Sequence, residues 1–243
     1  MFLDKFIMLY SHLIQPITLT LLPPCCLLCG TSTRNPHSLC SDCYKDLPIS
    51  TQNCPRCAQK LHSTSATCGA CLNHPPPFDE THALFPYQAP ITQLITKLKF
   101  QHQLSHAKAL GTLFCARIQE HWYQSKPLPD LLLPVPLHPA RLQARGFNQA
   151  VEIAKPIAKH FAIPLDLTGV RRIKPTAAQS GLSARQRKQN VAHAFASNED
   201  YTDRSLAVID DVMTTGHTLR ELCQLLKKKG AKHLTIWCVA RNE

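Results

Sequence analysis

The chain has 243 residues and a formal net charge of +11. Its length suits one medium-sized domain with a small additional one. The excess of positive charge indicates a polyanionic partner, such as nucleic acid or pyrophosphate. Disulfides need an oxidising compartment, and the chain shows no cleavable secretion signal, so we expect its cysteines to stay reduced in the cytoplasm.

The first 24 residues carry an apolar helical face. Its members are Phe2, Leu3, Phe6, Ile7, Leu9, Leu13, Ile14 and Ile17. Asp4, Lys5 and His12 interrupt this face, so we expect no transmembrane span. Residues 1–24 are predicted to pack on the protein itself, and a role at the membrane periphery or in partner docking is the alternative.

Four C-x-x-C pairs follow, beginning at Cys26, Cys40, Cys54 and Cys68 with a regular spacing of 14 residues. Each pair supplies two thiolates to a tetrahedral metal, whereas redox C-x-x-C motifs normally occur singly. We therefore predict two zinc ions. The predicted ligand sets are Cys26, Cys29, Cys40 and Cys43 for one ion, and Cys54, Cys57, Cys68 and Cys71 for the other. An interleaved pairing of the same cysteines remains the alternative.

Residues 25–75 are predicted to form a small double zinc ribbon. So short a segment buries too little apolar surface for its own core, so the metals should hold it folded. The stretch 72–77 ends in three prolines and indicates a stiff hinge, after which residues 76–243 form a second domain. Three further cysteines, Cys115, Cys223 and Cys238, lie in apolar patterns and are expected to be core residues.

Strands and helices alternate in the second domain. The pattern predicts strands at 83–87, 131–133, 164–170, 206–209 and 233–240, and helices at 91–100, 105–121, 148–160 and 219–229. This alternation favours an α/β fold in which helices cover both faces of a parallel sheet.

The strand at 206–209 runs directly into Asp210 and Asp211. A short loop and then the predicted helix follow. The loop residues are Thr214, Thr215, Gly216, His217 and Thr218. Backbone N–H groups at a helix N-terminus suit a phosphate, while the two carboxylates suit ribose hydroxyls or a Mg²⁺-bound sugar. This segment resembles the phosphoribosyl pyrophosphate (PRPP) motif of the type I phosphoribosyltransferase fold.

Positive charge is concentrated in residues 141–190, which contain ten lysines and arginines against two acidic residues. Arginine forks suit phosphates and stack on bases, so this excess favours phosphate recognition over an ordinary solvated surface. The candidate contacts to nucleic acid or pyrophosphate are Arg141, Arg145, Arg171, Arg172, Arg185, Arg187 and Lys188. Residues 174–203 have weak periodicity and are predicted to form a mobile loop beside the pocket.

Several motifs in combination resemble the ComF family of competence proteins. They include Pro134-Val135-Pro136-Leu137-His138, Arg145-Gly146-Phe147-Asn148-Gln149 and the phosphate loop. The resemblance implies a zinc ribbon joined to a type I phosphoribosyltransferase-like domain. It also implies an association with natural transformation, in which incoming single-stranded DNA is received in the cytoplasm.

Three functions fit these observations. The leading hypothesis is a cytoplasmic protein that binds single-stranded DNA during uptake and holds PRPP, a nucleotide or a DNA terminal phosphate in its pocket. Its zinc ribbon is expected to contact either DNA or a helicase-like partner at the inner face of the membrane. The second is a Mg²⁺-dependent phosphoribosyltransferase in which Asp210 and Asp211 are the catalytic residues, acting on a nucleobase or another nucleophile. The third is a zinc-ribbon adaptor whose phosphoribosyltransferase-like domain is a non-catalytic scaffold.

Overall fold

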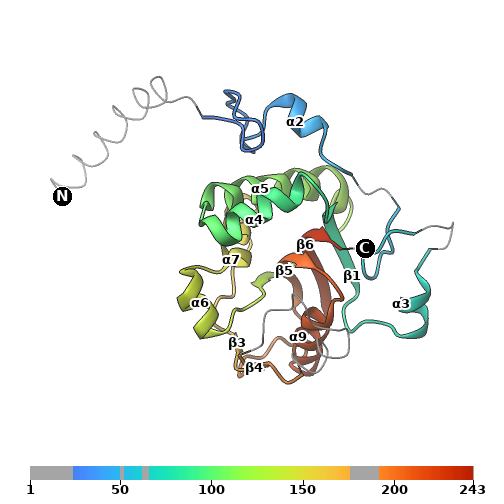
Figure 1. Ribbon diagram of the computed structural model, residues 1–243. Helices are drawn as coiled ribbons and strands as arrows, with labels where there is room; N and C mark the ends of the chain where they lie inside the picture. Colours follow the sequence, from blue (N-terminus) through green and yellow to red (C-terminus); the bar gives the residue numbers. More distant parts are fainter. Residues whose placement is uncertain (1–23, 50–51, 62–65, 176–191, 243) are drawn as a thin grey trace. The chain divides into compact units, whose positions relative to one another are not determined.

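A computed structural model describes residues 24–49, 52–61, 66–175 and 192–242 (Figure 1). Contacts divide the chain into two compact units, Met1–Leu47 and Pro48–Glu243. The apolar segment that the sequence singles out lies, except for its last residue, outside the described residues. Among the residues that are described, no helix has both the length and the apolar character needed to cross a membrane.

The described part of the first unit contains one cysteine knuckle and one short helix. In the knuckle, the N–H of Cys26 donates to the carbonyl of Thr31 at 2.7 Å, and that of Gly30 to the carbonyl of Cys26 at 2.9 Å. Helix α2 (Ser41–Lys45) begins directly after Cys40, whose Sγ accepts a hydrogen bond from the N–H of Cys43 at 3.4 Å. The turn and the helix each carry one C-x-x-C pair.

The second unit begins with the same arrangement. The N–H of Cys54 donates to the carbonyl of Gln59 at 2.8 Å, and that of Ala58 to the carbonyl of Cys54 at 2.8 Å. Ala58 has φ 55°, as Gly30 has φ 79° at the equivalent position of the first knuckle. Helix α3 (Gly69–Asn73) follows Cys68. The regular cysteine spacing in the sequence thus corresponds to a repeated knuckle and helical turn.

A four-stranded parallel sheet forms the centre of the second unit. Its strands are β1 (Glu80–Pro86), β6 (His233–Arg241), β5 (Ser205–Met213) and β2 (Leu131–Pro134), paired in that order. Strands β5 and β6 are almost wholly buried, as is usual for a parallel sheet covered on both faces. The predicted α/β fold with a parallel sheet is therefore confirmed.

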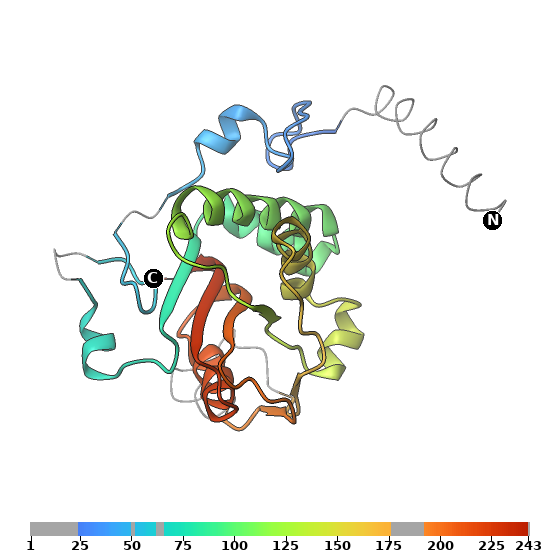
Figure 2. The ribbon, with the colours of Figure 1, turned by 180° about the vertical axis from the view of Figure 1, so that it is seen from behind.

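Helices cover both faces of this sheet. Helices α4 (Ile91–Gln101), α5 (Leu104–Arg117) and α7 (Gln149–Phe161) lie on one face, and α9 (His217–Lys228) lies on the other (Figures 1 and 2). A short π-helix, η1 (Ile118–Trp122), follows α5, and α6 (Pro139–Arg145) follows β2. The expectation that the three isolated cysteines are core residues is confirmed, because Cys115, Cys223 and Cys238 are all buried.

The strand predicted at 164–170 is wrong for all but two of its residues: Leu165 forms an isolated bridge with Leu132, and Val170 begins a different strand. The chain turns at once, because Oδ1 of Asp166 accepts the N–H groups of Thr168 and Gly169 at 3.1 and 2.7 Å.

A two-stranded antiparallel sheet follows this turn instead. Strand β3 (Val170–Arg172) pairs with β4 (Phe195–Ser197), which lies within the segment predicted as a loop. The centre of that segment, residues 176–191, is outside the described residues, so the prediction that it is mobile concerns residues that the structure does not describe.

Candidate functional site

A cavity of about 530 Å³ lies at the carboxyl ends of the parallel strands. Its walls come from β5 and the loop after it, from the start of α9, from α4 and from the segment 135–149. Of the predicted site residues, the cavity brings together Asp210, Asp211, Thr214, Gly216, His217, Thr218, Arg141, Arg145 and Arg172. Ligands of open parallel sheets commonly bind at this edge.

Strand β5 continues through the acidic pair, so it is longer than the sequence predicted. Asp210 pairs with Cys238, and Met213 pairs with Arg241 of β6. The Asp210 carboxyl turns back onto the strand to accept the Asp211 N–H, and the two carboxyl groups interact with each other. Only Asp211 forms an ion pair with a cation of α4, so the two carboxyl groups have different surroundings although they are adjacent in sequence.

Lys99 of α4 forms an ion pair with the Asp211 carboxylate. Burial alone would raise the pKa of Asp211, but the Lys99 ammonium outweighs it and lowers that pKa, so Asp211 is charged. Lys99 was not among the predicted residues. Lys99 follows the buried Leu98 and lies four residues after the buried Ile95, so it is at the border of the helix's apolar face. A lysine at that position was the one feature of the sequence that could have indicated a partly buried ion pair.

The pKa of the Asp210 carboxyl is shifted in the opposite direction. Burial raises its pKa well above the ordinary value, and the nearby Asp211 charge raises it further. Its Oδ1 accepts the N–H of Asp211 at 2.9 Å. A neutral carboxyl beside a charged one can both donate and accept hydrogen bonds, which suits hydroxyl groups of a ligand.

The loop between β5 and α9 places backbone N–H groups against the cavity. Gly216 precedes α9 with φ 73°, a left-handed backbone conformation that favours glycine, while a Cβ there would meet only the flexible end of the Met213 side chain, at 2.8 Å. Among the described residues, no side chain caps this helix N-terminus. Thr215 is exposed and is not among the described residues that line the cavity. The helix N-terminus is thus available to an anion.

Arginines also line this cavity. Nη1 of Arg145 donates to Oε1 of Gln149 at 2.6 Å, and its guanidinium lies 6.0 Å from the centre of the Phe100 ring. Arg172 is only 6% exposed, and its guanidinium lies 5.4 Å from the centre of the Phe195 ring. Arg185, Arg187 and Lys188 lie outside the described residues.

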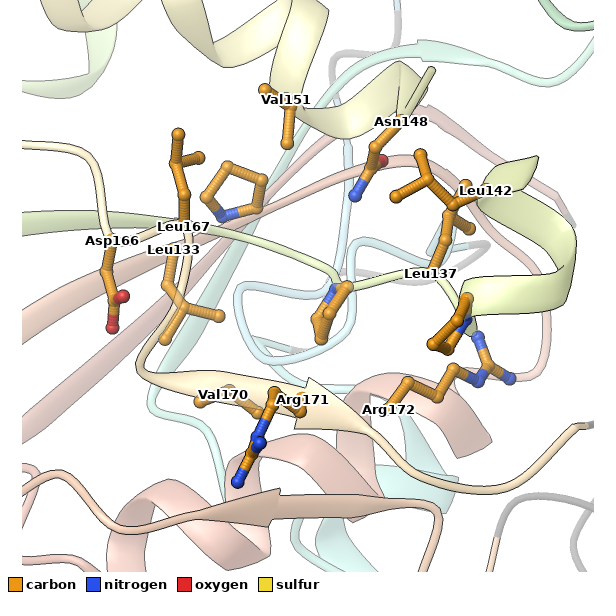
Figure 3. Close-up of a pocket in the computed structure, with 13 residues that line it drawn as sticks. Leu133, Leu137, Leu142, Asn148, Val151, Asp166, Leu167, Val170, Arg171 and Arg172 are labelled. Carbon is orange, nitrogen blue, oxygen red and sulfur yellow. The ribbon is translucent and has the colours of Figure 1, made fainter. Parts of the chain in front are cut away.

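A smaller cavity of about 230 Å³ adjoins the first, with Leu137 and Arg172 in both linings (Figure 3). The predicted site residue Arg171 lines this second cavity and is exposed. Its acidic group, Asp166, already binds Tyr201 and backbone N–H groups, and Asn148 caps α7. The remaining walls are mostly leucine, valine and proline, so charged recognition belongs to the larger cavity.

The cysteine pairs assemble in the sequential order. The Sγ atoms of Cys26, Cys29, Cys40 and Cys43 lie within 4.8 Å of one another, and so do those of Cys54, Cys57, Cys68 and Cys71. Burial raises the pKa of Cys26 and Cys54, but backbone N–H groups directed at their sulfurs outweigh it and lower these values to about 6 and about 7. Thiolates clustered in this way fit tetrahedral zinc. The two clusters support two zinc ions.

Comparison with known families agrees with both parts of the chain. Residues 17–72 match the double zinc ribbon domain, and residues 148–243 match the phosphoribosyl transferase domain. The DNA utilization protein YhgH of Salmonella typhi is 33% identical over 222 residues, which cover 90% of this chain and 98% of the relative.

Two competence proteins are also similar. Competence protein F of Haemophilus influenzae is 35% identical over 210 residues, covering 84% of this chain and 91% of that protein. Competence protein ComFC of Streptococcus pneumoniae is 27% identical over 238 residues, covering 89% and 99%. The YhgH protein and competence protein F are each at least 33% identical over most of this chain, and the chain therefore belongs to the ComF family, which joins a double zinc ribbon to a phosphoribosyltransferase domain.

Proposed function

We propose that this protein acts in DNA uptake by binding single-stranded DNA in the cytoplasm, and that its carboxyl-end cavity holds PRPP, a nucleotide or a terminal phosphate of DNA. The observation that carries this proposal is the pairing of the α9 N-terminus with arginines in the lining of one cavity. The names of the relatives, competence protein and DNA utilization protein, supply the biological setting.

The charge balance of the cavity favours a polyanion. Its described lining holds two carboxyl groups, Asp210 and Asp211, and Lys99 forms an ion pair with the second. With Arg141, Arg145 and Arg172, cationic side chains outnumber carboxyl groups in this lining even when both aspartates are ionised. Arginine forks bind phosphate oxygens in pairs, so a ligand with two or more phosphates would satisfy them best.

Single-stranded DNA would extend this recognition beyond one phosphate. Arg171 is exposed on β3 beside the cavity, where it would contact a backbone phosphate. Proteins that bind single strands without sequence preference combine such cations with stacking surfaces, and Phe100, which is 68% exposed, lies beside Arg145. The zinc ribbon would contact DNA or a helicase-like partner at the inner face of the membrane.

Fluorescence anisotropy of a labelled oligonucleotide tests this proposal. Zinc-loaded protein is titrated at several salt concentrations, with and without Mg²⁺ and PRPP. We expect affinity to fall steeply with salt, because each neutralised phosphate of a single strand contributes about 0.7 to the logarithmic slope. Competition by PRPP would place DNA at or near the cavity, while absence of DNA binding at low salt would contradict the proposal.

A matched pair of variants tests whether Arg145 contacts the DNA. Arg145→Gln and Lys159→Gln each remove one positive charge, but Lys159 is exposed near the far end of α7. Ten residues of helix place it roughly 15 Å from the end that faces the cavity. We expect Arg145→Gln to weaken binding and flatten the salt dependence, and Lys159→Gln to do neither.

A second function is favoured by the acidic pair. Asp210 and Asp211 lie in the same cavity as the helix N-terminus and the arginines, an arrangement that would orient the ribose of PRPP with Mg²⁺ and receive departing pyrophosphate. Release of pyrophosphate from PRPP in the presence of nucleobases tests this alternative. Turnover that is lost in Asp210→Asn would establish a phosphoribosyltransferase, and saturable PRPP binding without turnover would favour the DNA-binding function.

A further inference from the structure

The second cysteine knuckle is attached to the parallel sheet through its own backbone carbonyls. The N–H of Thr81, in β1, donates to the carbonyl of Pro55 at 2.8 Å, and its Oγ1 donates to that of Arg56 at 2.7 Å. Nη1 of Arg56 donates in return to the carbonyl of Phe78 at 3.3 Å. These bonds hold two successive peptide groups between the zinc-ligating Cys54 and Cys57 against the edge of the sheet.

The third carbonyl of this knuckle belongs to Cys57 and accepts a hydrogen bond from Arg241, the last residue of β6. Nε of Arg241 donates to the Cys57 carbonyl at 2.9 Å. Nη1 of the same guanidinium donates to the carbonyl of Met213 at 3.1 Å and to that of Thr214. Arg241 is only 8% exposed, so these bonds are shielded from water.

The two ends of this guanidinium therefore contact functionally different segments. One end binds the peptide of a zinc ligand, and the other binds the first residue of the phosphate loop. A planar guanidinium has a rigid arrangement of donors, so displacement of one acceptor changes how the other is held. Cys54, Cys57 and Cys71 also share a buried cluster with Met213 and Leu219 at the start of α9.

We propose that Arg241 is a positioning residue that couples the second zinc site to the phosphate loop, so that loss of zinc from Cys54, Cys57, Cys68 and Cys71 weakens binding of a phosphate-bearing ligand in the cavity. The ligand part of this inference rests on the function proposed above. Zinc bound to Cys57 holds the peptide that Arg241 contacts, and Arg241 then orients the Thr214 carbonyl and the N–H groups that follow it.

The first cysteine cluster provides an internal contrast. Its knuckle has the same backbone turn, but the backbone hydrogen bonds of Cys26, Leu27 and Gly30 in the described structure, such as Leu27 N–H to the Ser38 carbonyl at 3.0 Å, join residues of the first unit. Loss of zinc from Cys26, Cys29, Cys40 and Cys43 should leave the phosphate loop in place. The coupling is therefore specific to one of two chemically similar metal sites.

Variants of the full-length, zinc-loaded chain test the coupling by calorimetric titration with Mg²⁺-PRPP. Arg241→Met should retain both zinc ions but bind PRPP about tenfold more weakly or worse, the scale expected when charge-assisted hydrogen bonds that position a binding loop are lost. Arg241→Lys, which keeps the charge but not the planar fork, should fall between wild type and Arg241→Met. Arg204→Met, at an exposed arginine, is the control and should bind as wild type.

The metal arm compares Cys57→Ser with Cys29→Ser, each of which should contain one zinc ion less than wild type by elemental analysis. Cys57→Ser should lose as much PRPP affinity as Arg241→Met, and the double variant should lose no more than either, since both changes break one connection. Cys29→Ser should keep the wild-type affinity. Equal losses in Cys57→Ser and Cys29→Ser, or wild-type affinity in Arg241→Met, would overturn the coupling.

Two further readouts distinguish the coupling from a purely structural role of Arg241 and from a failure of the protein to bind PRPP. A purely structural role for Arg241 would lower the fraction of binding-competent protein while the Kd of that fraction stayed constant. Hydrogen exchange at residues 214–219 needs no ligand and should be faster in Arg241→Met and Cys57→Ser than in wild type. If wild-type protein did not bind PRPP, the PRPP part of the proposed function would fail, while the exchange data would still support or refute the coupling.

Discussion

At the amino end of the parallel sheet, an acidic side chain is paired with cationic groups and hydrogen-bond donors, whereas at the carboxyl end only one of two adjacent acidic side chains has an ion-pair partner. The Glu80 carboxylate, at the start of β1, accepts a hydrogen bond from Lys126 Nζ at 2.7 Å on each of its two oxygens. It also accepts one from the Thr235 hydroxyl at 3.0 Å. His82 lies 3.3 Å from the same carboxylate. Burial alone would raise the pKa of Glu80, but His82 and Lys126 lower it overall.

The carboxyl end, roughly 20 Å away along a seven-residue strand, holds Asp210 with a raised pKa beside an excess of arginine. Groups whose charge state is held away from its ordinary value, in a cavity, are typical of binding and catalytic sites. The amino end thus stabilises the fold, and the carboxyl end retains unfavourable electrostatics that a ligand would relieve. Four sets of substitutions would sharpen this contrast, from the largest expected loss of stability to one that should increase stability.

Lys99→Met should reduce the free energy of unfolding by about 3–5 kcal/mol, because it leaves the buried Asp211 carboxylate without its ion pair. Urea unfolding monitored by circular dichroism measures this loss. Lys108→Met, at an exposed lysine of α5, is the control and should change stability by less than about 0.5 kcal/mol. Equal stabilities of the two variants would show that the ion pair contributes nothing.

Glu80→Gln should cost about 1.5–3 kcal/mol near neutral pH, since it removes a charged acceptor of several hydrogen bonds. The folded-state pKa of Glu80 is lowered, so its contribution is complete above the unfolded pKa of about 4.3 and is lost as pH falls through the folded value. Unfolding measured from pH 7 to pH 3 should show the variant approaching wild type at the acid end. A constant difference across that range would contradict the assignment.

Gly216→Ala and Gly230→Ala compare the two ends directly, because both glycines have positive φ, 73° and 89°. Each substitution should cost about 1–2 kcal/mol of stability from left-handed backbone strain alone, with an added penalty at Gly230, where the new Cβ would meet the Thr202 backbone at 2.8 Å. Only Gly216→Ala should weaken PRPP binding, since Gly216 lines the cavity and Gly230 precedes β6 at the amino end. A similar loss of affinity in both would show that affinity merely follows stability.

Asp210→Asn should stabilise the protein by about 1.4 kcal/mol for each unit by which the folded pKa of Asp210 exceeds its unfolded value. The raised pKa means that the stability tied to the protonated carboxyl is present below about pH 3.9 and is lost as pH rises through the folded value. The gain in the variant should therefore grow with pH, opposite in sign to Glu80→Gln. A variant less stable than wild type at pH 7 would refute the assigned charge state.

Much of this arrangement was predictable from the sequence because it depends on local spacing. The C-x-x-C repeat predicted the metal sets, and the β-branched run before Asp210 predicted the central strand. Sequence also predicted that acids, hydroxyls and a helix N-terminus would meet, since carboxyl ends of parallel strands share one edge.

Other features depend on contacts between distant segments. Lys99 and Arg241 carry no motif, and each acquires its role from a partner more than 100 residues away in the sequence. The hairpin of β3 and β4 pairs residues on either side of a long segment, so no short-range turn signal announces it. The strand predicted at 164–170 failed because the Asp166 side chain binds its own backbone and turns the chain, a competition that apolar periodicity does not detect.

The most direct test of the central claim is calorimetric titration of Mg²⁺-PRPP into wild-type protein, Asp210→Ala and Glu80→Gln under identical conditions. If the carboxyl end is the ligand site, wild type and Glu80→Gln will bind with the same Kd, although the latter is less stable. Asp210→Ala, which removes the hydrogen-bonding carboxyl from the cavity, will bind more weakly. Failure of wild type to bind, or unchanged affinity in Asp210→Ala, would contradict the account.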